Sequence, residues 1–252
     1  MAQKSGWFPE QYKYQWLYNL TREKSMKMLR KAARIAAIMV MPILIAIPAY
    51  AYEEGDWVLR VGVGIVEPDD SSGPISLDGS EIPNSGVSVD VDSQPALALT
   101  YMLTNNVGLE IIASAPFEHQ ITGEGEFSGL SIGSTKHLPP TLSLQYYFFE
   151  GTPRFQPYAG IGVNYTAFFS EDLDSQFESA IGTGDLSVDD SVGLSLQLGA
   201  DYSINENWFA NVAVWKMDLE TTATIKLDAG PKVEVDVDVD PWVYMLTVGY
   251  KF

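Results

Sequence analysis

After residue 51, apolar and polar residues alternate with a period of two in eight separate segments. Successive side chains of a β-strand point to opposite faces of a sheet, so this pattern predicts strands with one apolar and one mixed face. Val61 and Val63 share one face of the first segment, and Arg60 and Gly62 share the other. The predicted strands contain residues 57–65, 97–103, 107–115, 142–148, 159–167, 192–202, 212–214 and 242–252. No run after residue 51 is long and apolar enough to predict a transmembrane helix.

The connections between these segments alternate between short and long. Short ones are predicted at residues 104–106, 150–154 and 205–207, and long ones at residues 67–93, 120–135 and 170–186. Bacterial outer-membrane barrels have an even number of antiparallel strands, short turns at one end and long loops at the other. The sequence therefore predicts an all-β fold, an eight-stranded antiparallel up-and-down transmembrane β-barrel. A soluble sandwich or lipocalin-like barrel would leave the aromatic residues at the strand ends without a reason.

The start of the chain has the pattern of a secretory signal peptide. In residues 24–51, basic residues precede an apolar run that closes on Ala49-Tyr50-Ala51. The apolar stretch is shorter than the roughly 20 residues that a spanning helix needs, so cleavage is favoured over anchoring. We expect residues 1–51 to be a signal peptide with an extra N-terminal extension, in which Met26 is a candidate for the true start. Residues 52–252 are then the barrel, located in the cell outer membrane after cleavage near Ala51.

The charge of the mature part excludes some partners. After residue 51 the chain has 7 basic and 31 acidic residues, a net charge of −24. Nucleic acid is not an expected partner, because its phosphates require Lys and Arg. The chain has no Cys, so neither a disulfide framework nor thiolate chemistry is expected. No cofactor is predicted, since the short glycine-rich stretches lack the Lys and following helix of a phosphate loop.

Five ordered blocks of sequence resemble the outer membrane protein W family of small porin-like barrels. The blocks are LTYMLTNNVGLEIIASAPFEH at residues 99–119, KHLPPTLSLQYYF at 136–148, FQPYAGIGVNYTAFF at 155–169, NENWFANVAVWKMDLETTA at 205–223 and DPWVYMLTVGYKF at 240–252. The resemblance covers nearly all of residues 55–252. It implies an eight-stranded barrel with a hydrophobic passage that admits small apolar molecules. The chain departs from the family in residues 67–93 and in the acidic approach to the last strand.

An eight-stranded barrel has an interior just wide enough to be filled by side chains or to hold one small ligand, so a wide aqueous pore is not expected. The alternation places polar Arg60, Glu110, Gln145 and Asp201 on the inner face. The large apolar candidates for lining the lumen are Met102, Ile112, Tyr158, Phe168, Trp215 and Met217. Two interpretations stay open at this point: these side chains line a greasy passage, or they plug the lumen.

The last residues carry a second kind of candidate site. Tyr250 and Phe252 end an alternating aromatic strand and resemble the signal that the barrel-assembly machinery reads. A plain last strand with an interfacial Phe is the simpler interpretation, and the two are compatible.

Acidic residues before the last strand alternate with valines and are expected on one side of its outer extension. Asp236, Asp238 and Asp240 are weak candidates for a divalent metal, which would also bridge anionic lipopolysaccharide. Aligned acids on a strand lack the encircling loop of a dedicated site, so a solvated charged face is favoured and no metal is predicted.

The chain has two histidines, His119 and His137, on either side of the 120–135 connection. Together they are short of the three or four ligands of a zinc site, which favours separate interfacial histidines over a pair. Either could serve a nearby Ser114, Ser131 or Ser134 in a lipid-processing enzyme. No motif fixes a nucleophile beside a base, so an enzyme is not predicted.

These patterns predict a narrow channel for the passive passage of small, hydrophobic molecules. The alternative is a structural or surface-interaction barrel with a plugged lumen and acidic external loops. The expected partners are outer-membrane lipid and lipopolysaccharide, the barrel-assembly machinery and a small hydrophobic ligand.

Overall fold

The computed structural model describes residues 52–149 and 154–252. The predicted signal peptide, its extension and Met26 lie outside the described residues, as does most of the predicted turn at 150–154. Within the described chain, no helix is long and apolar enough to cross a membrane.

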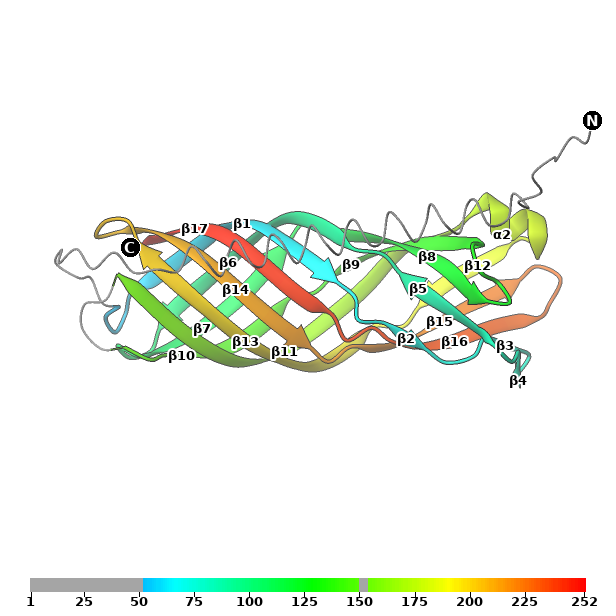
Figure 1. Ribbon diagram of the computed structural model, residues 1–252, viewed down its shortest axis with the longest axis horizontal. Helices are drawn as coiled ribbons and strands as arrows, with labels where there is room; N and C mark the ends of the chain where they lie inside the picture. The colour runs from blue at the N-terminus through cyan, green and yellow to red at the C-terminus, as the bar shows by residue number, and fades with distance from the viewer. Residues whose placement is uncertain (1–51, 150–153) are drawn as a thin grey trace, which may run out of the picture. The chain divides into compact units, whose positions relative to one another are not determined.

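Eight strands of the described chain close into an antiparallel barrel (Figure 1). They are β1 (Trp57–Glu67), β6 (Asp92–Met102), β7 (Val107–Ser114), β10 (Thr141–Tyr147), β11 (Phe155–Leu173), β13 (Ser191–Ser203), β14 (Trp208–Met217) and β17 (Trp242–Lys251). Neighbours in sequence are neighbours in the sheet, and β1 pairs with β17, so every strand has a partner on each side. This closure confirms the predicted fold class and removes the free edges that lipid cannot solvate.

The alternating apolar and polar residues of the strands lie on the outer and inner surfaces of the barrel, respectively. On the outside, Leu246 is 71% exposed and Leu198 is 62% exposed, whereas Arg60 on the inside is 1% exposed. Apolar side chains that are this exposed on every barrel strand form a band that needs lipid rather than water around it. The predicted apolar-out, polar-in arrangement is therefore confirmed.

The predicted long connections are wrong as loops, because most of their residues continue the sheet beyond the barrel. Within the described chain, the eleven-stranded sheet adds β5 (Ser85–Val89), β8 (Phe117–Gly125) and β9 (Ser131–Leu138). The six-stranded sheet contains β2 (Ser71–Ser72), β3 (Ser76–Leu77), β4 (Ser80–Glu81), β12 (Gly184–Val188), β15 (Glu220–Leu227) and β16 (Lys232–Asp238). A short helix, α2 (Ser175–Ala180), completes this end, at the right of Figure 1. We call this end of the molecule, where the strands extend beyond the barrel, the outer end.

The interior contains two separate apolar clusters. One lies inside the barrel and includes Met102, Tyr158 and Trp215. The other lies between the two sheets of the outer end and includes Ile121 and Phe177. The outer sheets therefore have an apolar inner face of their own, which the alternation of Val235 and Val237 with exposed acids produces on β16.

Gly62→Ala is expected to destabilise the barrel, because a Cβ at residue 62 would lie 2.1 Å from the backbone oxygen of Leu246 on β17. The backbone there closes the barrel and cannot move aside freely, and such overpacking costs about 1–3 kcal/mol. Thermal unfolding in detergent micelles measures the effect. Gly64→Ala on the same strand is the control, since its Cβ would meet side-chain atoms rather than backbone, the nearest being the Cβ of Ala96 at 3.3 Å. Equal losses in the two variants would contradict the steric argument.

Candidate functional site

A network of polar side chains crosses the lumen of the barrel toward the end opposite the outer end, and we call it the floor. At its centre, Arg60 donates to Asp201 from Nη2 at 2.7 Å and from Nε at 3.2 Å, and to Glu110 from Nη1 at 3.3 Å. The guanidinium carbon also lies 5.3 Å from the ring centre of Tyr158 and 5.4 Å from that of Phe209. The three charged groups are almost completely buried, so the pairing is what makes them tolerable there.

Hydrogen bonds extend the floor to all sides of the barrel. Tyr147 on β10 accepts from Arg60 at 3.0 Å, and Gln197 on β13 donates to Glu110 at 3.0 Å. Asn211 on β14 donates to Asp201 at 2.7 Å and to Tyr158 on β11 at 2.9 Å. The remaining members include Tyr52, Thr100, Gln145 and Thr247. Each of the eight barrel strands contributes a side chain, so the floor fills the cross-section of the lumen.

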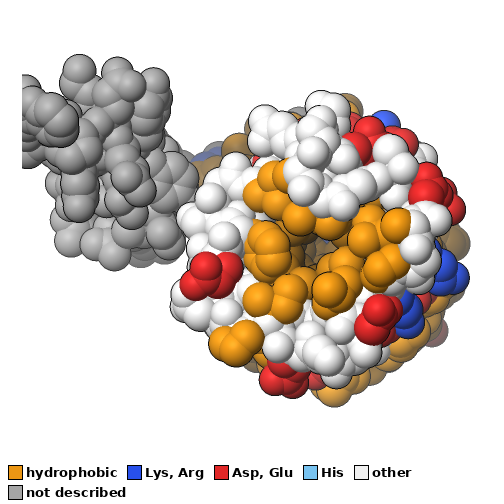
Figure 2. Space-filling model, turned by 90° about the vertical axis from the view of Figure 1, so that its right-hand side faces the viewer, with side chains coloured by type: hydrophobic (Ala, Val, Ile, Leu, Met, Phe, Trp, Pro, Cys, Tyr) orange, Lys and Arg blue, Asp and Glu red, His pale blue; other side chains and the backbone are white. Residues whose placement is uncertain are grey.

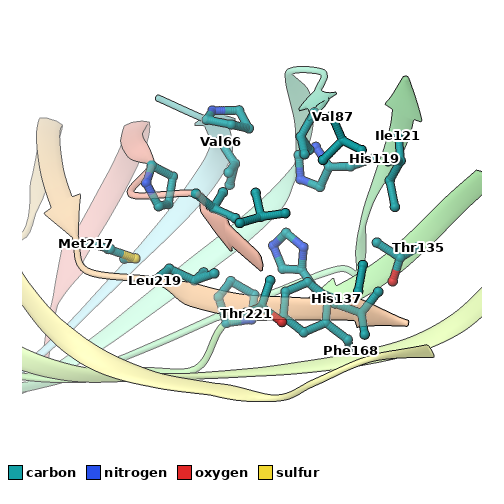
Figure 3. A pocket seen from close by; sticks show the side chains of 18 of the residues that line it. Val66, Val87, His119, Ile121, Thr135, His137, Phe168, Met217, Leu219 and Thr221 are labelled. Atoms are coloured by element: carbon teal, nitrogen blue, oxygen red, sulfur yellow. The ribbon is translucent and has the colours of Figure 1, made fainter. Parts of the chain in front are cut away.

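An apolar chamber lies on the outer side of the floor (Figure 3). Its lining contains Val, Ile, Leu, Ala, Met, Phe and Pro side chains, and the described residues that line it include no Lys, Arg, Asp or Glu. Its polar side chains are Thr135, Thr221, His119 and His137. This composition suits an uncharged apolar molecule.

A second apolar pocket continues the chamber to the outer end. The two pockets share Val87, Ile121 and Ala223 in their linings, so they adjoin, and we call the two together the shaft. Seen from the outer end, hydrophobic side chains surround a central hollow, and acidic residues lie around them on the rim (Figure 2). The interior is therefore apolar from the mouth to the chamber and polar at the floor.

The two histidines form a stacked pair in the wall of the chamber. Their ring centres are 5.0 Å apart and their planes differ by 5°. Phe117 stacks on His137 at 5.5 Å, and Phe168 meets the same ring edge-on at 5.5 Å. The prediction of separate interfacial histidines is wrong, because antiparallel pairing of β8 with β9 brings both rings to the inner face.

The comparisons with known proteins agree with this architecture. A family model described as the OmpW family matches residues 53–252. The chain belongs to the OmpW family. Outer membrane protein W of Vibrio cholerae serotype O1 is 44% identical over 220 residues, which is 86% of this chain and 98% of that protein. This OmpW family member is therefore an outer-membrane protein, as its sequence predicts.

Two further similarities extend the comparison of this OmpW family member. The crystal structure of the outer membrane protein OprG from Pseudomonas aeruginosa matches with a TM-score of 0.76 and 46% identity, covering 80% of this chain and 98% of that chain. The dibenzothiophene metabolism operon protein PahQ of Pseudomonas aeruginosa is 30% identical over 218 residues, which is 85% of this chain and 97% of that protein.

The structure divides the predicted lumen residues between two regions. Phe168 and Met217 line the chamber. The other four apolar candidates lie in the cluster inside the barrel and do not line the chamber: Met102, Ile112, Tyr158 and Trp215. The polar candidates Arg60, Glu110, Gln145 and Asp201 are all buried in the floor. The predicted lumen residues therefore lie at two depths, some in the packed interior of the barrel and some in the wall of the chamber.

The C-terminal aromatic residues lie at the end of the barrel opposite the mouth. Phe252 is 65% exposed and meets Tyr250 edge-on at 4.9 Å, and Tyr250 meets Trp208 in the same way. This placement fits an interfacial strand end. Their role as an assembly signal stays a prediction.

The acidic residues of the approach to β17 lie on the outer face of β16 and just after it. Asp236 accepts a hydrogen bond from Thr222 at 2.7 Å, and Asp240 accepts one from the backbone of Leu219 at 3.0 Å. No group of three or more His, Cys, Asp or Glu among the described residues is arranged to hold a metal ion. Asp238 is exposed.

The candidate serines are not joined to either histidine. Within the described chain, Ser131 donates to Asp174 at 3.0 Å and accepts from Gln120 at 3.0 Å, and no hydrogen bond links Ser114 or Ser134 to an imidazole. These three serines therefore do not have the geometry of a nucleophile beside its base.

Sequence reasoning missed most of the chamber wall. Val87 and Val89 come from a segment expected to be a loop, and Leu219, Ala223 and Val237 come from the hairpin before the last strand. The signal that could have found them is the same alternation, since VEVDVDV at residues 233–239 places valines on one face.

Arg60→Met is expected to destabilise the protein by about 3–5 kcal/mol, because it leaves Asp201 and Glu110 buried without their counter-charge. Urea unfolding in detergent micelles, followed by tryptophan fluorescence, measures the change. A variant that also carries Glu110→Gln and Asp201→Asn removes all three charges and should recover most of the loss. A triple variant as unstable as the single one would contradict a role for charge pairing in the floor.

Acidification is expected to destabilise the protein through His137, which lies beyond the apolar band, on a strand whose outer face carries Lys136 paired with Glu118. Burial, and then the neighbouring His119, lower the pKa of His137 from 6.5 to about 3, against an opposing effect of Asp92. Between these pH values the unfolded chain binds a proton that the folded chain does not, so stability falls as the pH drops. At about pH 4.5 the loss is on the order of 2 kcal/mol.

The matched variant for this pH effect is His137→Phe, which keeps an aromatic ring in the stack and removes the titration. Its unfolding temperature should fall less than that of the natural protein between about pH 7 and about pH 4.5. Parallel falls in the two proteins would rule out His137 as a source of the pH dependence.

Proposed function

We propose that this protein is a passive conduit that takes small, uncharged, hydrophobic molecules from the outer side of the membrane. The observation that carries the proposal is the apolar shaft, whose two adjoining pockets have no charged side chain in their described linings. Moving an apolar molecule from water into such a shaft is favourable by roughly 25 cal/mol for each Å² of apolar surface buried. A gradient of the molecule itself is then sufficient to drive entry.

A relative supports the chemistry of the cargo. PahQ is named for an operon of dibenzothiophene metabolism, and dibenzothiophene is an uncharged apolar aromatic compound. A molecule of that kind fits a lining of aliphatic and aromatic side chains. We extend this class, small and uncharged with mostly apolar surface, to the present chain.

The floor makes passage straight through the barrel unfavourable, so we propose that the molecule leaves the chamber sideways. Between β7 and β10 the pairing ends at Ile112 and Thr141, and between β8 and β9 it starts at Phe117 and His137. Among the described residues, no backbone hydrogen bond joins the intervening residues 113–116 to residues 138–140. Pro139, which lines the chamber, belongs to this gap in the wall.

The chamber favours the conduit over the two other classes of function. A barrel that only presents its surface would be served by a floor and a filled interior, and an apolar shaft open to the outside would have no use there. A lipid-processing enzyme would need a nucleophile within reach of a base, and the histidines contact aromatic rings instead.

Ala223→Trp is expected to abolish most of the uptake, because residue 223 lines both pockets and an indole there would fill the junction between them. Uptake of a hydrophobic fluorescent dye by cells that produce the protein measures the effect, relative to cells without it. Lys226→Trp is the matched control, since residue 226 is exposed on the same strand and its indole would lie outside the shaft.

The two tryptophan variants separate the conduit from a barrel that does not transport. Lys226→Trp should retain nearly all of the dye uptake, and both proteins should reach the outer membrane in equal amounts. Undiminished uptake by the Ala223→Trp protein would refute the shaft as the route.

A further inference from the structure

At the outer end, the closed sheet of the barrel divides into two sheets that enclose the shaft. One contains β5, β8, β9 and the outer part of β11, and the other contains β2, β3, β4, β12, β15 and β16. In Figure 1, β8 and β9 lie in the upper part of this end, and β15 and β16 lie in the lower part. The outer end is therefore a pair of sheets, and two seams separate them.

The first seam lies between residues 68–75 and β5, beyond the level at which β1 stops pairing with β6. Among the described residues, no hydrogen bond between two backbone groups crosses this seam. Three side chains bridge it instead, each accepting from a backbone amide on the other side at 2.7–2.8 Å: Asp70, Ser72 and Ser85. A strand ladder repeats its bonds along its whole length, so three separate bridges hold these edges less firmly than a ladder would.

The second seam lies between residues 167–173 of β11 and β12, and it has the same construction. In the described part of the chain, no backbone ladder joins the two sides beyond the last pair of β11 with β13. At the inner end of this seam, Asp190 accepts from the backbone of Phe168 at 3.0 Å and from the hydroxyl of Tyr165 at 2.6 Å. The register of β11 against β9 also shifts at this level, and a bulge of this kind bends its strand.

Both seams border the chamber. Pro68 and Val87 line it from the two sides of the first seam, and Phe168 and Val188 line it from the two sides of the second. Figure 3 shows Val87 and Thr221, which belong to different sheets, in the wall of the same cavity. The spacing between the two sheets therefore sets the width of the chamber.

We propose that the outer end works as a clamp, whose two sheets move apart at the seams to admit an apolar molecule and then close around it. The inference rests on the proposed conduit and adds a conformational step to entry. The closed state buries apolar side chains of both sheets, including Ile121 and Ile225, and this burial favours closure. The barrel ladders end below the seams, so this movement leaves the barrel itself closed.

A single disulfide can lock the first seam. A Cβ on Gly86 of β5 would lie 3.9 Å from the Cβ of Ser72 on the other side. The Cβ atoms of natural disulfides lie about 3.5–4.5 Å apart, so the variant Ser72→Cys/Gly86→Cys has suitable geometry. The natural chain has no Cys, so oxidation of this variant forms one defined bond.

The test measures how fast N-phenyl-1-naphthylamine, an apolar dye that fluoresces in apolar surroundings, enters the protein in lipid nanodiscs. Stopped-flow fluorescence gives the rate after subtraction of the signal from protein-free nanodiscs. The oxidised seam variant is expected to take up the dye about tenfold more slowly than the reduced one, because opening precedes entry. Addition of dithiothreitol should restore the rate.

The matched control is a disulfide within one sheet, Thr222→Cys/Asp236→Cys. These residues are directly paired on β15 and β16, and neither lines the shaft. The control bond joins two strands of the same sheet and does not cross a seam, so its oxidation should leave dye entry unchanged. Mass spectrometry confirms the bond in both variants.

Residue-resolved amide hydrogen exchange tests the clamp without a variant. The amides of Val87 and Val89 face the first seam, where they donate to side chains. Amide directions alternate along a strand, so the amide of Ser88 between them faces β8. Opening of the seam should make Val87 and Val89 exchange at least about tenfold faster than Ser88.

The outcomes separate the clamp from the conduit on which it rests. Equal dye entry before and after oxidation of the seam variant, with its bond formed, overturns the clamp and leaves the conduit intact. Equal slowing in the control variant also overturns the clamp, as does exchange at Val87 and Val89 that is no faster than at Ser88. Failure of the dye to enter the natural protein overturns the conduit.

Discussion

A backbone inside a lipid bilayer has no water with which to form hydrogen bonds, so each strand must find a partner on both sides. The pairing of β1 with β17 and of β10 with β11 meets this requirement by closing the sheet. The closed sheet has eight strands, and this strand number sets the width of the lumen and so the volume that side chains or a ligand can occupy. The floor, the chamber and the mouth are all arrangements within that narrow cross-section.

The interior of the protein is densely packed and polar at one depth and apolar with open space at another. At the floor, Arg60 compensates two carboxylates and collects hydrogen bonds from around the barrel, which makes a dense polar plug. Beyond the apolar band, the two outer sheets enclose an apolar interior that keeps open space. A molecule that prefers an apolar environment can therefore enter from the outer end, but it meets charged, desolvated groups at the floor. That contrast is the physical basis for proposing a sideways exit.

In the chamber wall, the register between two strands brings together two side chains that are far apart in sequence. His119 and His137 are separated by a hairpin, and the pairing of Phe117 with His137 sets their rings one step apart on the same face. Their rings stack, and one buried nitrogen of each has no hydrogen-bond partner among the described residues.

The sequence by itself determined the barrel, its strand order, its apolar outer face and the inward direction of Arg60, Glu110 and Asp201, because alternation with a period of two fixes the face of each residue. It could not determine which inward residues meet across the lumen, since that depends on the stagger between strands. The sequence also did not show that residues 67–93 and 218–240 form strands of the outer end beyond the barrel, because those strands pair with partners that are distant in sequence. Only the tertiary structure put Trp215 and Tyr158 into a packed interior, Phe168 into a chamber and the two histidines face to face.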